Sequence, residues 1–175
     1  MALAFGAADT LTIEYNQVHY GDSRMKAMSP GEYWSMPDGA RPRFDVAFSI
    51  SSFEHDGLGR YGDPLNPDAD LEAMAEMERV VVDGGLLLLA VPVGAEALIW
   101  NAHRVYGRKR LAMLLHRWRV LHRLTLTLPD MTCLHDIPEA MFDRRVYAPE
   151  QPLFVLQNTR PEGITGISHA SLDIE

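Results

Sequence analysis

The chain has 175 residues, of which 47% are hydrophobic and 23% charged, with one cysteine and a formal net charge of −8. This length fits one globular domain, and the composition excludes a disordered, fibrous or disulfide-stapled protein. The negative charge argues against holding nucleic acid by bulk charge, and the longest apolar run, residues 86–93, is too short to span a membrane. We therefore expect a cytoplasmic protein.

The first third of the chain predicts two short strands, a helical turn and one buried strand. Residues 11–15 (LTIEY) are β-branched and aromatic, which is typical of a strand. A very short strand at 26–28 and a helical turn at 30–34 follow among prolines and glycines. Residues 44–50 (FDVAFSI) are almost continuously apolar, which predicts a strand covered on both faces in a parallel sheet. Residues 56–67 form a long loop.

Helix and strand signals alternate in the rest of the chain. Apolar residues at helical spacing predict a helix from Pro67 to about Val82, and Asp83-Gly84-Gly85 is expected to end it. A second buried strand at 86–93 follows, and then a basic helix that starts at Val105 or Leu111 and ends near Leu115. Residues 120–128 and 153–157 have strand character, with no clear pattern between them. The chain therefore predicts an α/β domain with a mostly parallel sheet, whose last two strands pair antiparallel at one edge.

Polar side chains follow the predicted strands, at the edge where open α/β sheets bind ligands. Glu14 comes after the first strand, where a carboxylate can accept hydrogen bonds from ribose hydroxyls. The plainer interpretation is an exposed glutamate at a strand end. The other candidates on this edge are Ser51, Ser52, Phe53, Glu54, His55, Asn101, His103 and Arg104.

Glu54 and His55 place a carboxylate beside an imidazole, the side chain most easily tuned for proton transfer near neutral pH. The alternative is that one of the two only caps a helix or pairs with a loop. In residues 56–67, five of twelve residues are glycine or proline, and a loop of this length is often functional. Its Arg60, Tyr61 and Asp63 indicate a surface that contacts substrate.

Residues 103–123 carry seven of the sixteen lysines and arginines and no acid, so they are a candidate site for an anion. The alternative is a solvated helix face that pairs with residues 54–83, which contain nine acids and two arginines. The histidines and the single cysteine show no metal-ligand spacing, so we expect no metal. The order GxGxxG at residues 57–62 precedes a proline-rich loop rather than a helix, which argues against a nicotinamide-dependent dehydrogenase.

Two sets of motifs resemble known families. FDV at 44–46, EH at 54–55, ERV at 78–80 and GGL at 84–86 resemble the second half of the class I S-adenosylmethionine-dependent methyltransferases. SSFEHDGLGRYGDPLNPDADLEAM at 51–74, with NAHRVYG at 101–107 and TIEYN at 12–16, is similar to an uncharacterised methyltransferase-like family of unknown function. The resemblance implies a Rossmann-like, mostly parallel sheet with a C-terminal antiparallel hairpin. It implies a domain at residues 1–160 and a tail at 161–175.

The resemblance also implies site residues and a cofactor. Glu14 would hold the ribose of S-adenosylmethionine, and Ser51, Ser52 and Phe53 would lie near its methionine portion. Glu54 or His55, and with less support His103, would accept a proton from an oxygen or nitrogen nucleophile. The resemblance names no acceptor; we expect a small molecule or a glycan, contacted by Arg60, Tyr61, Asp63, Asn101 and Arg104.

The chain departs from the family at its beginning, because the first strand and its glycine-rich turn are not in it. We therefore expect a fragment of a longer gene product. By itself it should bind the cofactor weakly or not at all and have weak or no activity, unless the strand and turn are supplied. The rival hypothesis is a non-catalytic binding module that uses residues 103–123 for an anionic ligand or partner.

Overall fold

The chain divides into two units, Met1–Pro42 and Arg43–Glu175, which are described separately. The computed structural model describes residues 2–127, 132–134, 136–143 and 150–159. The single domain expected over residues 1–160 stays a prediction, and the tail expected at 161–175 lies outside the described residues. None of the helices in these described ranges has the length and apolar sequence needed to cross a membrane.

The N-terminal unit contains a small parallel sheet and one short helix. Strand β1 (Thr10–Ile13) pairs with β2 (Met25–Met28), and both strands were predicted. The predicted helical turn is α1 (Pro30–Ser35), whose N-terminus is fixed by a capping box. In this box the Ser29 side chain accepts from the Glu32 backbone, and the Glu32 carboxylate accepts from the backbone N–H of Ser29 at 2.7 Å. A single-turn helix η1 (Ala2–Phe5) precedes β1.

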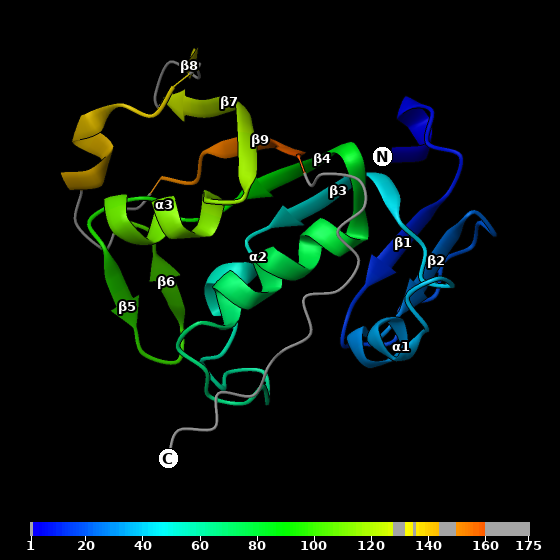
Figure 1. Ribbon diagram of the computed structural model, residues 1–175. Helices are drawn as coiled ribbons and strands as arrows, with labels where there is room; N and C mark the ends of the chain where they lie inside the picture. Colours follow the sequence, from blue (N-terminus) through cyan, green and yellow to red (C-terminus); the bar gives the residue numbers. More distant parts are fainter. Residues whose placement is uncertain (1, 128–131, 135, 144–149, 160–175) are drawn as a thin grey trace. The chain divides into compact units, whose positions relative to one another are not determined.

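The second unit is built on a five-stranded mixed sheet with the order β3-β4-β9-β7-β8 (Figure 1). Its strands are β3 (Phe44–Ile50), β4 (Val81–Ala90), β7 (Trp118–Thr127), β8 (Thr132–Leu134) and β9 (Leu153–Asn158). Among the described strands of this sheet only β3 and β4 pair in parallel, so the prediction of a mostly parallel sheet is wrong. The predicted antiparallel pair of late strands is confirmed as β7 and β9. Among the described residues no α-helix connects β7 to β9, and a parallel pairing would need a long crossover.

The glycine pair after α2 (Ala69–Val80) lies inside a strand rather than ending the helix. Helix α2 stops at Val80 and β4 begins at the next residue, because consecutive valines favour extended backbone. Gly84, at φ +77°, sits where the pairing with β3 shifts register, from Phe44 opposite Val81 to Val46 opposite Leu86. The expected stop at Asp83-Gly84-Gly85 is therefore wrong, and the glycines form a bulge in β4.

A small hairpin and a second helix lie between β4 and β7. Strand β5 (Ala97–Ile99) pairs antiparallel with β6 (His103–Val105), and neither strand was predicted. Helix α3 (Arg108–Leu115) begins between the two starting points that the sequence allowed. Two single-turn helices, η2 (Phe53–His55) and η3 (Glu139–Asp143), complete the unit.

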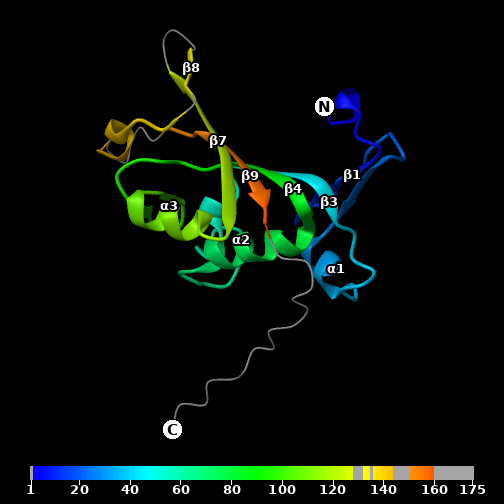
Figure 2. The ribbon, with the colours of Figure 1, turned by 45° about the horizontal axis from the view of Figure 1, so that its top comes forward.

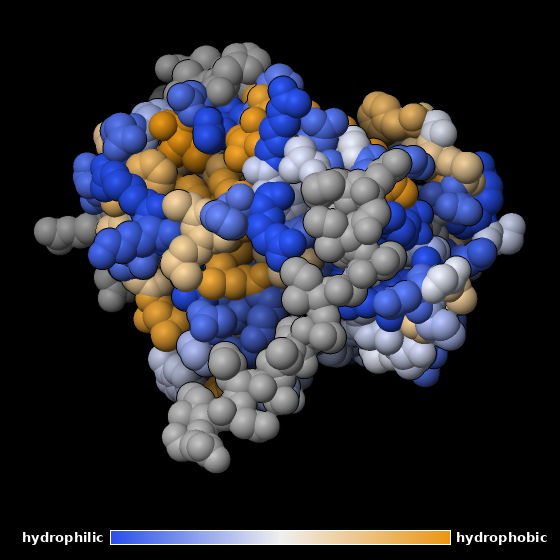
Figure 3. All heavy atoms as spheres, in the orientation of Figure 1, coloured by the Kyte–Doolittle hydropathy of each residue, from blue (hydrophilic) through white to orange (hydrophobic). Residues whose placement is uncertain are grey.

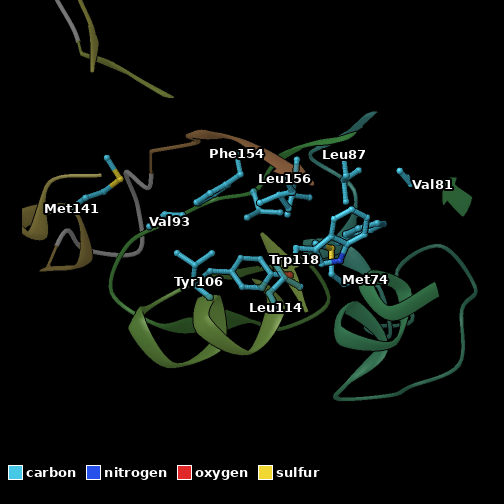
Figure 4. Packing of buried hydrophobic residues seen from close by; sticks show 14 residues of the cluster. Met74, Val81, Leu87, Val93, Tyr106, Leu114, Trp118, Met141, Phe154 and Leu156 are labelled. Carbon is cyan, nitrogen blue, oxygen red and sulfur yellow. The ribbon is translucent and has the colours of Figure 1, made fainter. Parts of the chain in front are cut away.

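Helices α2 and α3 both lie on one face of the sheet (Figure 2). Apolar residues also reach the surface between these two helices (Figure 3). The core lies between the helices and the sheet, where Leu87 and Leu89 of β4 pack with Phe154 and Leu156 of β9 (Figure 4). Burial of such side chains contributes about 1.5–3 kcal/mol each.

The sequence analysis expected strand β3 to be covered on both faces, and this is wrong, because β3 is at the edge of the sheet and one of its faces is exposed. Val46, Phe48 and Ile50 alternate along one face and are 42%, 63% and 55% exposed. The apolar run at residues 44–50 therefore describes a strand with one buried face. A continuous apolar pattern does not distinguish the two cases when the outer face is itself apolar.

Candidate functional site

The candidate site begins where β3 and β4 end side by side. Ser51 follows β3 directly and donates its backbone N–H to the carbonyl of Ala90, the last residue of β4, at 3.0 Å. Its φ of +53° is uncommon for a residue with a side chain. Strained backbone of this kind is concentrated at functional sites. The chain turns sharply here and enters η2, which places the side chains of Glu54 and His55 at the sheet edge.

Glu54 is a buried carboxylate held by Ser51. The Ser51 hydroxyl donates to Glu54 Oε1 at 2.6 Å, and the glutamate side chain is 1% exposed. Its other oxygen, Oε2, is buried without a hydrogen-bond partner among the described residues. A buried carboxylate oxygen without a donor is costly, so it favours the approach of a hydrogen-bond donor or a cation.

His55 has a defined tautomer because of one backbone contact. Its Nδ1 lies 2.6 Å from the carbonyl oxygen of Ala102, and a carbonyl can only accept a hydrogen bond. Nδ1 therefore carries the proton in the neutral ring, and Nε2 presents a lone pair. Nε2 lies 3.7 Å from Glu54 Oε1, and the ring is 23% exposed. The pair can take up a proton at Nε2 and stabilise the resulting charge with the carboxylate.

Aromatic rings flank His55. The rings of Tyr61 and His103 stand edge-on to it, with centroid separations of 5.9 and 6.3 Å. The Arg60 guanidinium lies 5.7 Å from the centroid of the Tyr61 ring. The structure thus brings together Glu54, His55 and His103, with the loop residue Tyr61, while their roles stay predictions.

Loop 56–67, which carries Arg60, Tyr61 and Asp63, is held in place by side chains that hydrogen bond to its backbone. Asp63 accepts hydrogen bonds from the backbone N–H groups of Gly59 and Tyr61, at 3.1 and 3.2 Å. Arg104 is 4% exposed and donates to the carbonyl of Asp56 at 2.5 Å and to that of Pro67 at 3.1 Å. Arg104 therefore ties both ends of the loop together, which favours a structural role for it over contact with a ligand.

The centre of this support is Asp70, which the sequence analysis did not single out. Its carboxylate is fully buried and accepts from the Tyr106 hydroxyl and from Arg110 Nε, both at 2.9 Å. Arg104 Nε lies 3.7 Å away. Burial and the neighbouring Asp70 carboxylate raise the pKa of Tyr106 above its ordinary value. From sequence, Asp70 is only one of the acids in the first turn of a helix, so no local pattern marks it as buried.

Asp56 gives the loop a pH dependence. Burial, together with the charges of Asp63 and Asp70, raises the pKa of Asp56 from 3.8 to about 7. The folded state thus resists ionisation of this group, so its contribution to stability is complete below pH 4 and is lost as the pH rises towards 7. Replacing Asp56 with Asn is expected to stabilise the protein at pH 8 by on the order of 2 kcal/mol, allowing for partial exposure.

The measurement is urea unfolding of wild type and Asp56→Asn at several pH values between 4 and 8. The difference between the two proteins is expected to grow with pH and to vanish near pH 4. A difference that stays constant over this range would contradict the raised pKa.

The remaining predicted residues are placed as follows. Ser52 is exposed at the start of η2, whereas Phe53 belongs to the hydrophobic core and cannot offer its ring to a ligand without leaving it. Asn101 is exposed in the turn between β5 and β6 with a φ of +56°. Glu14 lies directly after β1 in the N-terminal unit and accepts from the Asn16 backbone at 3.2 Å. Its role stays a prediction.

The basic segment 103–123 is largely paired with acids. Arg117 Nε lies 2.8 Å from Glu78, Arg110 contacts Asp68 and Asp70, and Arg104 approaches Asp70. These acids belong to residues 54–83, the segment that the sequence analysis named as the alternative partner. Arg108 pairs with an acid outside that segment, Glu139, at 2.8 Å. Ion pairing thus accounts for much of this charge, which weakens the case for an anion-binding module.

The sequence matches, over residues 1–136, a family described as "Caenorhabditis protein of unknown function, DUF268". The chain belongs to this family. No curated protein matches the DUF268 chain. Among solved structures it is similar to TehB from Haemophilus influenzae, with 12% sequence identity and a TM-score of 0.43 over 77% of this chain. The match covers 41% of TehB, so the DUF268 chain spans about two fifths of that protein's length.

Membership of a family of unknown function confirms that part of the resemblance. The family description names no activity, so a function has to be argued from the site. Among the described residues, no three histidine, cysteine or acidic side chains are grouped to hold a metal ion. At the candidate site, the carboxylate of Glu54 and the imidazole of His55 can together transfer a proton.

Proposed function

We propose that the DUF268 chain is a methyltransferase-like domain whose acceptor site is the cluster Ser51, Glu54 and His55. The proposed reaction moves a methyl group from S-adenosylmethionine to an oxygen or nitrogen nucleophile of a small molecule or glycan. The observation that carries the proposal is the fixed tautomer of His55, which presents Nε2 beside a buried carboxylate at the carboxyl ends of two parallel strands. Ligands of α/β sheets bind at this edge.

The chain's own residues would handle the proton. His55 Nε2 takes it from the nucleophile, while the Nδ1–H bond to Ala102 keeps the ring in place. Glu54, 3.7 Å away, stabilises the imidazolium that results. Tyr61, edge-on to His55 and 65% exposed, offers an aromatic surface on which an acceptor can lie. No other base is needed for this step.

The residues at this edge also fit the proposed cofactor, which supplies an electrophilic methyl group on a positively charged sulfur. Glu54 Oε2 is buried without a donor from the part of the chain that the structure describes, and such an oxygen favours a cation. Ser51 and Ser52 are exposed beside it and can hydrogen bond to a polar ligand. The antiparallel pair β7 and β9 supports the proposal too, since the resemblance implies such a closing hairpin.

The test is a titration of the ¹⁵N-labelled chain with S-adenosylmethionine, followed by NMR. Amide signals of residues 51–55 are expected to move in a saturable manner, with weak affinity. In a longer version of the chain that supplies the first strand and glycine-rich turn, Glu14→Ala should weaken cofactor binding by roughly 1.5–3 kcal/mol if its carboxylate accepts ribose hydroxyls. Asp9→Ala, an exposed acid just before β1, is the matched control and should bind as wild type.

Two outcomes would count against the proposal. If S-adenosylmethionine moves other signals to saturation while those of residues 51–55 stay fixed, the cofactor binds elsewhere and the cluster is not its site. If Glu14→Ala in the longer chain binds as tightly as wild type and Asp9→Ala, Glu14 does not hold the ribose.

A further inference from the structure

A cavity lies away from the candidate site, between α2 and α3. Its volume is about 410 Å³, within the range of about 300–1,000 Å³ that is typical of small-molecule sites. Apolar side chains dominate its lining, and those used below are Leu71, Met74, Ala75, Met113, Leu114 and Trp118. No residue of the candidate site lines it, so the inference does not depend on the proposed methyl transfer.

Trp118 provides a hydrogen-bond donor in this apolar setting. The residue is 6% exposed, and its indole Nε1 is buried with no acceptor among the described residues. Buried donors in folded proteins nearly always have an acceptor, so one without a partner calls for an explanation. Trp118 lies beside Met74 in the core (Figure 4). An acceptor brought by a ligand would satisfy this N–H.

The charges around the cavity favour an uncharged ligand. Glu78 and Arg117 both line it, and Arg117 Nε lies 2.8 Å from Glu78 Oε1, so the two charges neutralise each other. His116 is the remaining titratable group in the lining. A ligand with a net charge would gain no unpaired counterion here and would lose its hydration.

Two methionines make the cavity adaptable. Met113 is 56% exposed at its surface, whereas Met74 is buried against Trp118. Methionine side chains are unbranched and change rotamer easily, so they can move aside for a ligand that reaches the indole nitrogen. Apolar residues gather at the surface between α3 and α2, where the cavity opens (Figure 3).

We propose that this cavity binds an uncharged apolar small molecule whose carbonyl oxygen accepts the hydrogen bond of Trp118 Nε1. The apolar body would lie on Leu71, Met113 and Leu114, which supply most of the contact. The carbonyl would fix its orientation. This division between an apolar surface and one placed polar group is typical of small-molecule sites.

The experiment uses 4-phenylbutan-2-one as the probe and follows the three tryptophan indole N–H signals of the ¹⁵N-labelled chain. Only the Trp118 signal, assigned with Trp118→Phe, is expected to move, with a dissociation constant on the order of 1 mM for a ligand of this size. The charged analogue 4-phenylbutanoate should bind more weakly. Ligand-detected NMR on Trp118→Phe should show roughly fivefold weaker binding of the ketone, since one hydrogen bond is lost.

Two variants of α2 distinguish binding in the cavity from non-specific binding to the surface. Ala75→Phe fills the cavity from α2 and should abolish binding, whereas Glu72→Phe puts the same ring at an exposed position of α2 and should not. Thermal unfolding checks that both variants fold. The proposal is overturned if no indole signal moves, if all three move together, or if Ala75→Phe folds and still binds. It is also overturned if Trp118→Phe binds the ketone as tightly as wild type.

Discussion

Replacing Asp70 with Asn is expected to lower the free energy of unfolding by about 3–5 kcal/mol, the cost of removing one partner from a buried ion pair. The carboxylate is fully buried and accepts from Tyr106 and Arg110. In the variant Arg104, whose side chain is 4% exposed, would stay buried without its nearby counterion. An uncompensated buried charge costs more than a lost hydrogen bond. Urea unfolding at neutral pH measures the effect.

The matched control is Asp143→Asn, which also takes a carboxylate away from an arginine. Asp143 lies 3.4 Å from Arg108, and its side chain is 75% exposed. Removing such a surface pair should change stability by at most about 1 kcal/mol. If Asp70→Asn were no more costly than this control, Asp70 would not be what holds loop 56–67 in place.

Loss of Asp70 should also loosen the loop locally. Arg104 and Arg110 hold the loop through backbone carbonyls, and Asp70 orients both guanidinium groups. Faster exchange of the Asn66 amide, which donates to the Gly57 carbonyl, than in Asp143→Asn would show that the effect reaches the loop and is not confined to the core.

The elements that the sequence predicted are those with a long apolar signal. Strand β3 matches its predicted bounds, and β9 and α2 nearly so, because their apolar residues recur over six residues or more. Strands β5 and β6 have three residues each, which is too few for a periodic pattern. Strand direction was harder, because an apolar run such as β4 looks alike beside a parallel and an antiparallel neighbour.

The candidate site was partly visible in the sequence for a topological reason. Parallel strands end at one edge, so the residues after β3 were expected to meet others there, and His55 does contact the β5–β6 turn. The sequence did not show which of these side chains would be buried. Phe53 and Arg104 were expected to face a ligand, yet one lies in the core and the other binds the loop from inside.

The buried contacts that support the site could not be predicted from the sequence for the same reason. Asp70, Tyr106 and Arg110 are separated by up to 40 residues, and their contact depends on how α2, β6 and α3 pack. Each residue type is ordinary at its own position. Only the fold shows that an acid in the first turn of α2 faces inward.

Replacing Gly57 with Ala is expected to lower the free energy of unfolding by about 3 kcal/mol or more, through two separate effects. The first is backbone strain, because Gly57 has a φ of +73°. The second is a clash, because a Cβ at this position would overlap the carbonyl oxygen of Asn66 and lie 2.7 Å from the Cβ of Ala69. The loop closes here, with Asn66 donating its N–H to the Gly57 carbonyl at 3.0 Å.

Gly62→Ala in the same loop separates the two effects. Gly62 has a φ of +85°, but a Cβ there would meet nothing within 4 Å, so only the strain of about 1–2 kcal/mol is expected. The excess cost of Gly57→Ala over Gly62→Ala, measured by urea unfolding, reports how tightly the two ends of the loop are packed. Equal costs for the two variants would mean that the loop yields easily at Asn66. In that case it could not hold Tyr61 against His55, as the proposed site requires.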